Sequence, residues 1–141
     1  MIVCFDADVL IYSIESGNVA GERVVALLDR IAADPASEAV GSVLLVPEVL
    51  TKPRRDDPSS AEVTQLTSVL ARLTLHPVTE STAHVALALA TKYGLRAADA
   101  CHLATALVAG ADFFVTNNRR DFPRTISEIT VLYPEDLGDT D

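Results

Sequence analysis

The sequence predicts an α/β fold with a central parallel sheet, and three observations lead to this prediction. Short apolar runs alternate with longer stretches of helical periodicity, an order that is typical of parallel strands joined by helices. Hydrophobic residues make up 49% of the chain, as in globular proteins. The length of 141 residues fits one sizeable core, so we expect a single domain over residues 1–141.

The first expected elements are a strand at residues 2–5, a helix from near Asp8 and a longer helix over residues 19–33. The longer helix is predicted because its apolar side chains recur on one stripe until Asp34-Pro35 ends it. A second strand is expected at residues 39–42, which form another short apolar run.

Prolines divide the middle of the chain. A short helix carries Glu48, and we expect Pro53 to keep it from continuing, which leaves residues 52–57 as a charged loop. Either Asp57-Pro58 or Ser59 then caps the helix that follows.

The last part of the chain repeats the alternation. It contains expected strands at residues 73–77, 112–115 and 129–132 and expected helices at residues 81–93 and 97–109. A glycine directly follows each of these two helices, and glycine is the favoured residue just past a helix C-terminus.

The formal net charge of −9 is awkward for a protein that binds phosphates, because affinity for nucleic acid comes mainly from Lys and Arg. Part of the acidic excess lies in a C-terminal tail at about residues 134–141. The basic residues gather in two groups, at Lys52, Arg54 and Arg55 and at Arg119, Arg120 and Arg124. These are either solvated loop charges or contacts to a phosphate backbone.

The sequence also indicates the cellular compartment of the protein. No apolar run reaches the roughly 18 residues that a membrane span needs, and no basic segment precedes the first strand as in a secretory signal. Cys4 and Cys101 lack the spacing of metal ligands, and both fall in segments that we expect to be buried. We interpret them as small core residues of a cytoplasmic protein.

Three carboxylates, Asp6, Glu48 and Asp99, each lie at or near the start of an expected helix. In a parallel sheet the strand ends and the nearby helix starts meet at one edge, so these residues can come together. At about 6 Å and an effective dielectric constant of about 20, each pair of such charges costs roughly 3 kcal/mol. A hard divalent cation such as Mg²⁺ removes this repulsion, and we therefore predict that the three residues bind one.

Simpler interpretations apply to some of these acids and their neighbours. An Asp just past a buried strand can simply cap the next helix, because Asp is a favoured N-cap; we prefer this interpretation for Asp8 and metal binding for Asp6. If Glu48 does not bind a metal, it is a surface residue in the first turn of its helix. Asp99 lies in the first turn of an apolar helix, where the helix dipole favours an anion. The simpler interpretation is that Asp99 only forms a surface pair with Arg96. His102, nearly one turn further on, we interpret as a core histidine, in preference to a residue that orients a metal ligand.

A polar turn follows the fourth expected strand and contains Thr116, Asn118 and Asp121. These side chains either bind metal-bound water or phosphate, or only build the turn, as Asn and Asp often do. We leave both interpretations open for the three residues and interpret Asn117 as a turn residue.

Four segments together resemble the PIN domain, in particular the toxin ribonucleases of VapBC toxin–antitoxin modules. The segments are residues 5–11 with Asp6, residues 42–48 with Glu48, residues 99–106 with Asp99 and residues 115–122 with Thr116. They occur in the family's order and together span nearly the whole chain. The family often has an Asp at the position of Asn118, so Asp121 is a second candidate for that role.

The resemblance implies a three-layer α/β/α domain with a central parallel sheet, and Mg²⁺- or Mn²⁺-dependent endonucleolytic cleavage of RNA by the toxin of a type II module. The metal ligands that it implies are Asp6, Glu48 and Asp99. Thr116, Asn118 and Asp121 would position water or phosphate. The resemblance also implies a homodimer and a cognate VapB-like antitoxin whose C-terminal segment wraps the toxin.

Two alternatives remain open from the sequence. A catalytically silent PIN-like domain would bind RNA or a partner without cutting. A haloacid-dehalogenase-type phosphatase also begins with a strand followed by Asp-x-Asp, with Asp6 as nucleophile and Asp8 as general acid. That family needs a late acidic pair after a strand, and here the fourth strand leads to Thr116 and two asparagines.

Overall fold

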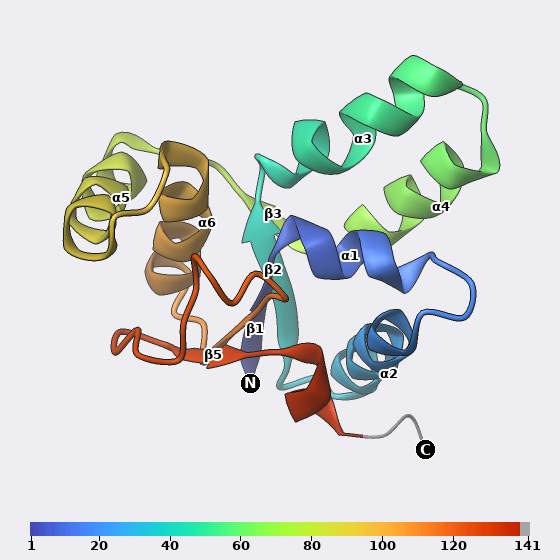
Figure 1. The fold of residues 1–141 in the computed structure, drawn as a ribbon. Coiled ribbons are helices and arrows are strands. Elements are labelled where there is room, and N and C mark those ends of the chain that lie inside the picture. The colour runs from blue at the N-terminus through green and yellow to red at the C-terminus, as the bar shows by residue number, and fades with distance from the viewer. Residues whose placement is uncertain (139–141) are drawn as a thin grey trace.

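A computed structural model describes residues 1–138 and contains a five-stranded parallel sheet (Figure 1). The strands are β1 (Ile2–Phe5), β2 (Glu38–Ser42), β3 (Thr74–His76), β4 (Phe113–Val115) and β5 (Thr130–Leu132). Their order across the sheet is β3-β2-β1-β4-β5, and every neighbouring pair is parallel. The predicted parallel sheet is confirmed, and its first strand is the central one.

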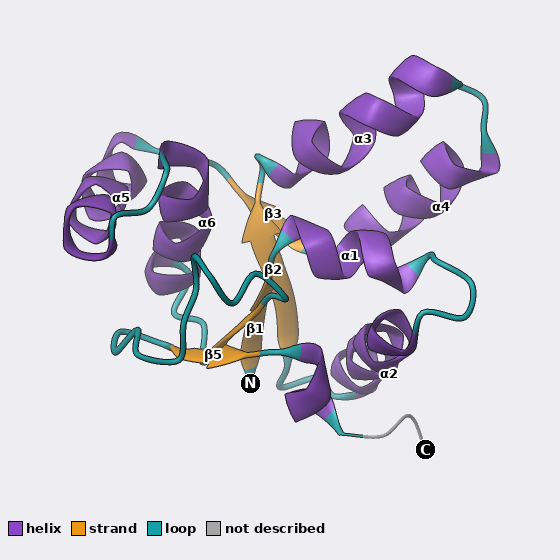
Figure 2. Cartoon of the chain, in the orientation of Figure 1, coloured by secondary structure: helices purple, strands orange, loops and turns teal. Residues whose placement is uncertain are grey.

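Helices cover both faces of this sheet (Figure 2). They are α1 (Ala7–Ser13), α2 (Val19–Ala33), α3 (Leu45–Asp56), α4 (Ala61–Leu70), α5 (Glu80–Tyr93), α6 (Ala97–Val108) and the short 3₁₀ helix η1 (Pro134–Leu137). Helices α1 to α4 lie on one side of the sheet and α5 and α6 on the other, which confirms the three layers (Figure 1).

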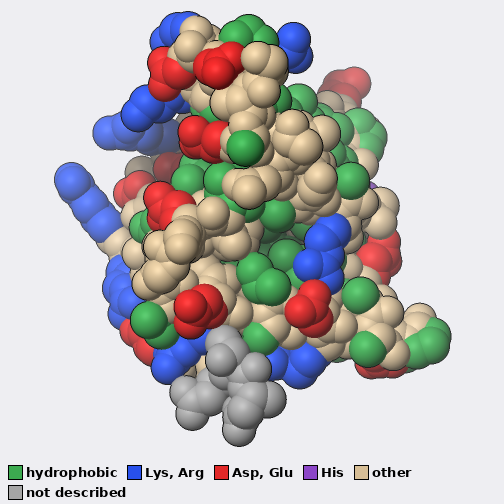
Figure 3. All heavy atoms as spheres, turned by 90° about the vertical axis from the view of Figure 1, so that its right-hand side faces the viewer, with side chains coloured by type: hydrophobic (Ala, Val, Ile, Leu, Met, Phe, Trp, Pro, Cys, Tyr) green, Lys and Arg blue, Asp and Glu red, His purple; other side chains and the backbone are tan. Residues whose placement is uncertain are grey.

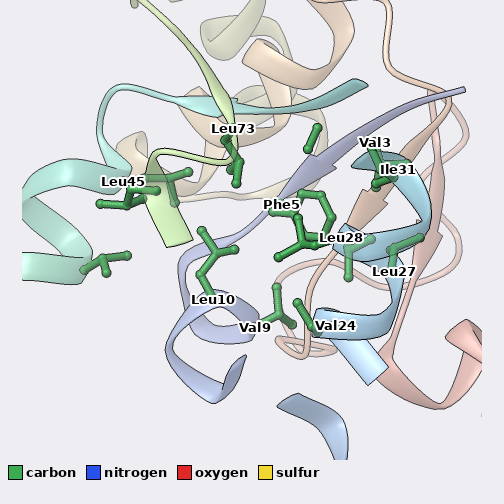
Figure 4. Close-up of a cluster of buried hydrophobic side chains, with 14 of the residues drawn as sticks. Val3, Phe5, Val9, Leu10, Val24, Leu27, Leu28, Ile31, Leu45 and Leu73 are labelled. Carbon is green, nitrogen blue, oxygen red and sulfur yellow. The ribbon is translucent and has the colours of Figure 1, made fainter. Parts of the chain in front are cut away.

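The strands have a hydrophobic core on each face, because successive side chains of a strand point to opposite sides. Val3 and Phe5 of β1 pack with the side chains of α1 to α4, many of which are shown in Figure 4. Cys4 points the other way and packs against α5 and α6. Burial on both faces explains why the strands appear in the sequence as continuous apolar runs.

The prediction that Asp8 caps the first helix was wrong. Asp6 is the N-cap of α1, and its Oδ1 accepts a hydrogen bond of 2.8 Å from the backbone N–H of Ala7. An N-cap residue has extended backbone angles, and Asp6 has them because it directly follows β1. Asp8 already lies within the first turn of the helix.

The prediction that residues 52–57 form a loop was also wrong, because α3 continues through Pro53 to Asp56. Proline removes one backbone hydrogen bond within a helix. Pro53 is buried, and Arg54 and Arg55 lie in the last turn, where positive charge suits the helix dipole. The next helix is capped by Ser60, whose Oγ accepts from Val63, rather than by either predicted candidate.

Part of the predicted acidic tail is folded. Its first residues form η1, where Glu135 pairs with Arg119 and Asp136 pairs with Arg124. Residues 139–141 of the tail, with their two aspartates, lie outside the described residues. Among the helices within residues 1–138, none has both the length and the apolar character needed to cross a membrane.

Candidate active site

Asp6 lies one residue past the central strand, at the carboxyl edge of the sheet. Its backbone N–H donates to the carbonyl of Val115 in β4 over 2.9 Å. Its side chain is buried, and Oδ2 accepts a hydrogen bond of 2.7 Å from the hydroxyl of Thr116. Burial raises the pKa of Asp6, and the Thr116 hydroxyl partly opposes this rise. Strands β1 and β4 therefore fix the position of this carboxylate.

The turn after β4 extends the hydrogen bonds of Asp6. Thr116 is fully buried, and its Oγ1 also accepts from the backbone N–H of Asn118 over 3.0 Å. The side-chain amide of Asn118 donates to Asp121 Oδ2 at 2.9 Å, and its Oδ1 accepts from the backbone N–H of Asp121 at 3.2 Å. Of the three polar residues predicted in this turn, Thr116 thus contacts Asp6 directly, and Asn118 and Asp121 are linked to it by hydrogen bonds.

Asp99 reaches the same edge from the first turn of α6. Its pKa is raised, first by partial burial and then by the negative charges of Asp6 and Asp121. The charge of Glu48 also raises the pKa of Asp99, but less than these two. The carboxylates of Asp6, Glu48 and Asp121, from distant parts of the sequence, therefore lie close enough to disfavour the ionisation of Asp99.

Glu48 lies in the first turn of α3. Its carboxylate contacts His102, which was predicted from the sequence to be a core histidine. Its Oε2 is 2.9 Å from Nε2 of His102 on α6. The His102 side chain is buried, as predicted, but it contacts the carboxylate rather than only apolar neighbours. The one sequence signal for this role is that His102 stands three residues after Asp99 on a helix that is otherwise apolar.

Asp8 links α1 to the turn after β4 instead of capping a helix. Its Oδ2 accepts from the backbone N–H of Asn117 over 3.0 Å, and its Oδ1 accepts from Val9 over 2.7 Å. Burial, followed by the charge of Asp6, raises the pKa of Asp8 to about 6. Asp8 thus supports the local structure beside Asp6.

The donors at this edge fit a hard divalent cation by their chemistry. Carboxylate oxygens are the ligands that Mg²⁺ prefers, and Mg²⁺ usually keeps several waters that can span to a carboxylate. A cation would also relieve the repulsion that adds to the effect of burial in raising the pKa of Asp6 and Asp99. Within residues 1–138, no three His, Cys, Asp or Glu side chains lie close enough together to hold an ion directly. A cation would therefore have to bind through water or after a small movement of the carboxylates.

A pocket of about 370 Å³ opens next to Glu48, between α1, α3 and α4. Its lining combines apolar side chains with several acids and one lysine: Ile11, Glu15, Glu48, Val49, Lys52, Pro53, Asp56, Glu62 and Leu66. The pocket therefore suits a ligand that carries both apolar and positively charged groups.

The fold and this acidic edge define an α/β protein whose candidate functional residues gather at the carboxyl ends of its central strands. The family model of the PIN domain matches residues 3–126, so the chain belongs to the PIN domain family. This confirms the family predicted from the four motifs and supports a nuclease activity in general terms. A comparison with curated proteins gave no match.

Several solved structures share the fold, and three of them are of toxin–antitoxin complexes. The chain is similar to part of a toxin–antitoxin complex from Klebsiella pneumoniae, with 23% identity, a TM-score of 0.70, and coverage of 94% of this chain and 97% of that one. It is similar to VapBC2 from Rickettsia felis bound to a promoter DNA fragment, with 17% identity, a TM-score of 0.74, and coverage of 94% and 98%. It is also similar to DNA-bound VapBC from Salmonella typhimurium, with 15% identity, a TM-score of 0.68, and coverage of 95% and 98%.

Proposed function

We propose that this protein is a Mg²⁺- or Mn²⁺-dependent endoribonuclease that acts in the cytoplasm as the toxin of a type II toxin–antitoxin module. The observation that carries the proposal is the gathering of Asp6, Glu48, Asp99 and Asp121 at one edge of a PIN domain. These acids come from four separate segments of the chain, and three of them raise the pKa of the fourth, Asp99. Structural ion pairs alone do not account for such a concentration of one charge.

Asp6, Glu48 and Asp99 would hold the metal, directly or through water. A bound divalent cation supplies an activated water and neutralises charge on the phosphate oxygens. Thr116 keeps one carboxylate oxygen of Asp6 in a fixed place through its 2.7 Å hydrogen bond. Asn118 and Asp121 are held against each other at the same edge, where their polar atoms can position water or phosphate.

We further propose a VapB-like antitoxin as the partner, because the similar structures are of toxin–antitoxin complexes. The pocket beside Glu48 supports this proposal, since a segment with apolar and basic side chains suits its lining. On the face formed by α1 to α4, acidic side chains are dispersed among basic ones, and the basic ones are most frequent at the left margin (Figure 3). Such a face offers negative sites to a basic partner.

We also propose a homodimer. Helices α5 and α6 leave an apolar pocket of about 300 Å³ between them, lined mainly by alanines together with Leu87 and Cys101. Leu87, which is 64% exposed, adds to the apolar lining of this pocket, and a contiguous exposed apolar patch is typical of an interaction surface. A second copy of the chain would cover this surface.

The proposed activity is tested by incubating purified protein with total RNA in Mg²⁺, in Mn²⁺ and in EDTA, beside the variant Asp99→Asn. We expect discrete fragments that require both the metal and Asp99. Cleavage at the wild-type rate by a folded Asp99→Asn variant would contradict the metal-site model. RNA binding without fragments under any condition would favour a catalytically silent PIN-like domain instead.

A further inference from the structure

His102 is a buried histidine beside the acidic centre, and the proposed function gives it no role. It lies in the second turn of α6, three residues after Asp99, and its side chain is 1% exposed. One ring nitrogen, Nε2, contacts Glu48 Oε2 at 2.9 Å, whereas the other, Nδ1, is buried without a hydrogen-bond partner. The hydrogen bond that the His102 ring makes is therefore the one to Glu48.

The contact defines which ring nitrogen carries a proton. A lone pair on Nε2 would repel the carboxylate oxygen that it faces, so Nε2 carries the proton and donates to Glu48. The buried Nδ1 gains nothing from its own surroundings. A histidine that served only to fill the core would leave two polar atoms to be compensated, and an apolar residue would fill the same space without that cost.

The same contact joins two layers of the protein. Glu48 is on α3 and His102 on α6, and these helices lie on opposite sides of the sheet (Figure 1). The Glu48 side chain is 35% exposed and has several rotatable bonds, so α3 alone does not fix its carboxylate. Through His102 the carboxylate is held to the helix that also carries Asp99.

We propose that His102 is a positioning residue, which holds the Glu48 carboxylate where it can share a divalent cation with Asp99. This proposal rests on the proposed function, since it requires a metal at the acidic edge. Carboxylates that ligate metals are themselves held by hydrogen bonds, and such outer partners orient the ligand. The contact occupies Oε2 of Glu48 and leaves Oε1 available to the cation or to its waters.

The test measures Mn²⁺ affinity by isothermal titration calorimetry in the absence of RNA. His102→Phe removes the donor and retains the bulk, and we expect its affinity to fall about 10-fold or more. His102→Gln keeps a donor at about the same reach and should stay closer to the wild type. His102→Leu replaces the Phe variant if circular dichroism shows that the larger ring does not fit.

His76→Phe is the matched control. His76 ends β3, and its Nε2 is also buried without a partner, but it lines a separate small cavity with Thr79 and Thr82. We expect its Mn²⁺ affinity to equal that of the wild type. A fall as large as that of His102→Phe would overturn the proposal, because any loss of a histidine from the interior would then have the same effect.

A double-mutant cycle adds a second criterion. In a Glu48→Ala background, His102→Phe should cause no further loss of Mn²⁺ affinity, because His102 acts through Glu48. Losses that add, or Phe and Gln variants with equal affinities, would overturn the positioning role. A wild-type protein that binds Mn²⁺ but cuts no RNA would contradict the proposed ribonuclease and leave the positioning role intact, whereas a wild type without Mn²⁺ affinity would overturn both.

Discussion

Asp6 and Glu48 are both proposed metal ligands, but the protein holds them in different ways. Asp6 directly follows the central strand, is buried, and is bonded to the backbone of α1 and to Thr116. Glu48 stands on α3, remains in contact with solvent, and is held by the side chain of His102. Asp6 thus owes its position to the backbone and is destabilised as an anion, whereas Glu48 owes its position to one side-chain neighbour.

The largest expected effect is that of Asp6→Asn on RNA cleavage. We expect a loss of more than about 100-fold, because removal of an outer partner of a ligand alone costs about 10- to 100-fold. The same variant should unfold at a higher urea concentration at pH 7, since burial opposes the ionisation of Asp6 and Asn is an equally good N-cap.

Glu48→Gln is the control for that variant. It should also reduce cleavage, but its free energy of unfolding should stay within about 0.5 kcal/mol of the wild type, as for substitutions near the surface. A fall in the stability of Asp6→Asn would show that its charge is compensated in the folded protein, and the contrast between the two residues would disappear.

Thr116→Val tests whether the position of Asp6 depends on its hydroxyl partner. The variant leaves Asp6 Oδ2 and the backbone N–H of Asn118 without the Thr116 oxygen. We expect a loss of about 1–3 kcal/mol in the free energy of unfolding, measured with urea. Thr105→Val is the matched control, because Thr105 is equally buried but donates only to a carbonyl of its own helix. Equal losses of stability in both variants would contradict a particular contribution of the Thr116 hydrogen bonds to Asp6 and Asn118.

The raised pKa of Asp8 predicts that the stability of the protein depends on pH. The pKa of Asp8 in the folded protein, about 6, lies above the ordinary 3.8, so the protonated form favours folding. This contribution is complete below about pH 4 and is lost as the pH rises through 6. We expect the stability of the wild type, relative to Asp8→Asn, to rise by about 1 kcal/mol between pH 7 and pH 5. A pH-independent difference in urea unfolding would refute the raised pKa.

The smallest effect on stability is expected for Arg119→Ala. Arg119 pairs with Glu135 at the surface and lies 4.6 Å from the ring centre of Tyr133. Exposed pairs contribute little to stability, so the urea midpoint should not change measurably. If Arg119 also contacts RNA phosphate, the salt dependence of RNA binding should weaken by about one unit of slope. A large loss of stability would show that surface contacts matter here as much as the buried ones.

The sequence predicted the fold more completely than the site. The five strands and the helix at residues 19–33 follow from apolar runs and periodicity, which are local signals. The helix through Pro53 and the cap at Asp6 were missed, because packing on α4 and the exact end of β1 decide them. The Glu48–His102 contact joins residues 54 positions apart, and no local pattern encodes it.

The position of β1 in the sheet also determines when the site can form during synthesis. β1 is made long before β4, yet it pairs with β4, and Asp6 bonds to Thr116, which lies 110 positions later. A chain that is released before residue 116 therefore has Asp6 but lacks the strand and the turn that hold it. Under the proposed function, a ribosome that makes this protein is not exposed to a complete cleavage site until β4 and the turn that follows it have been made.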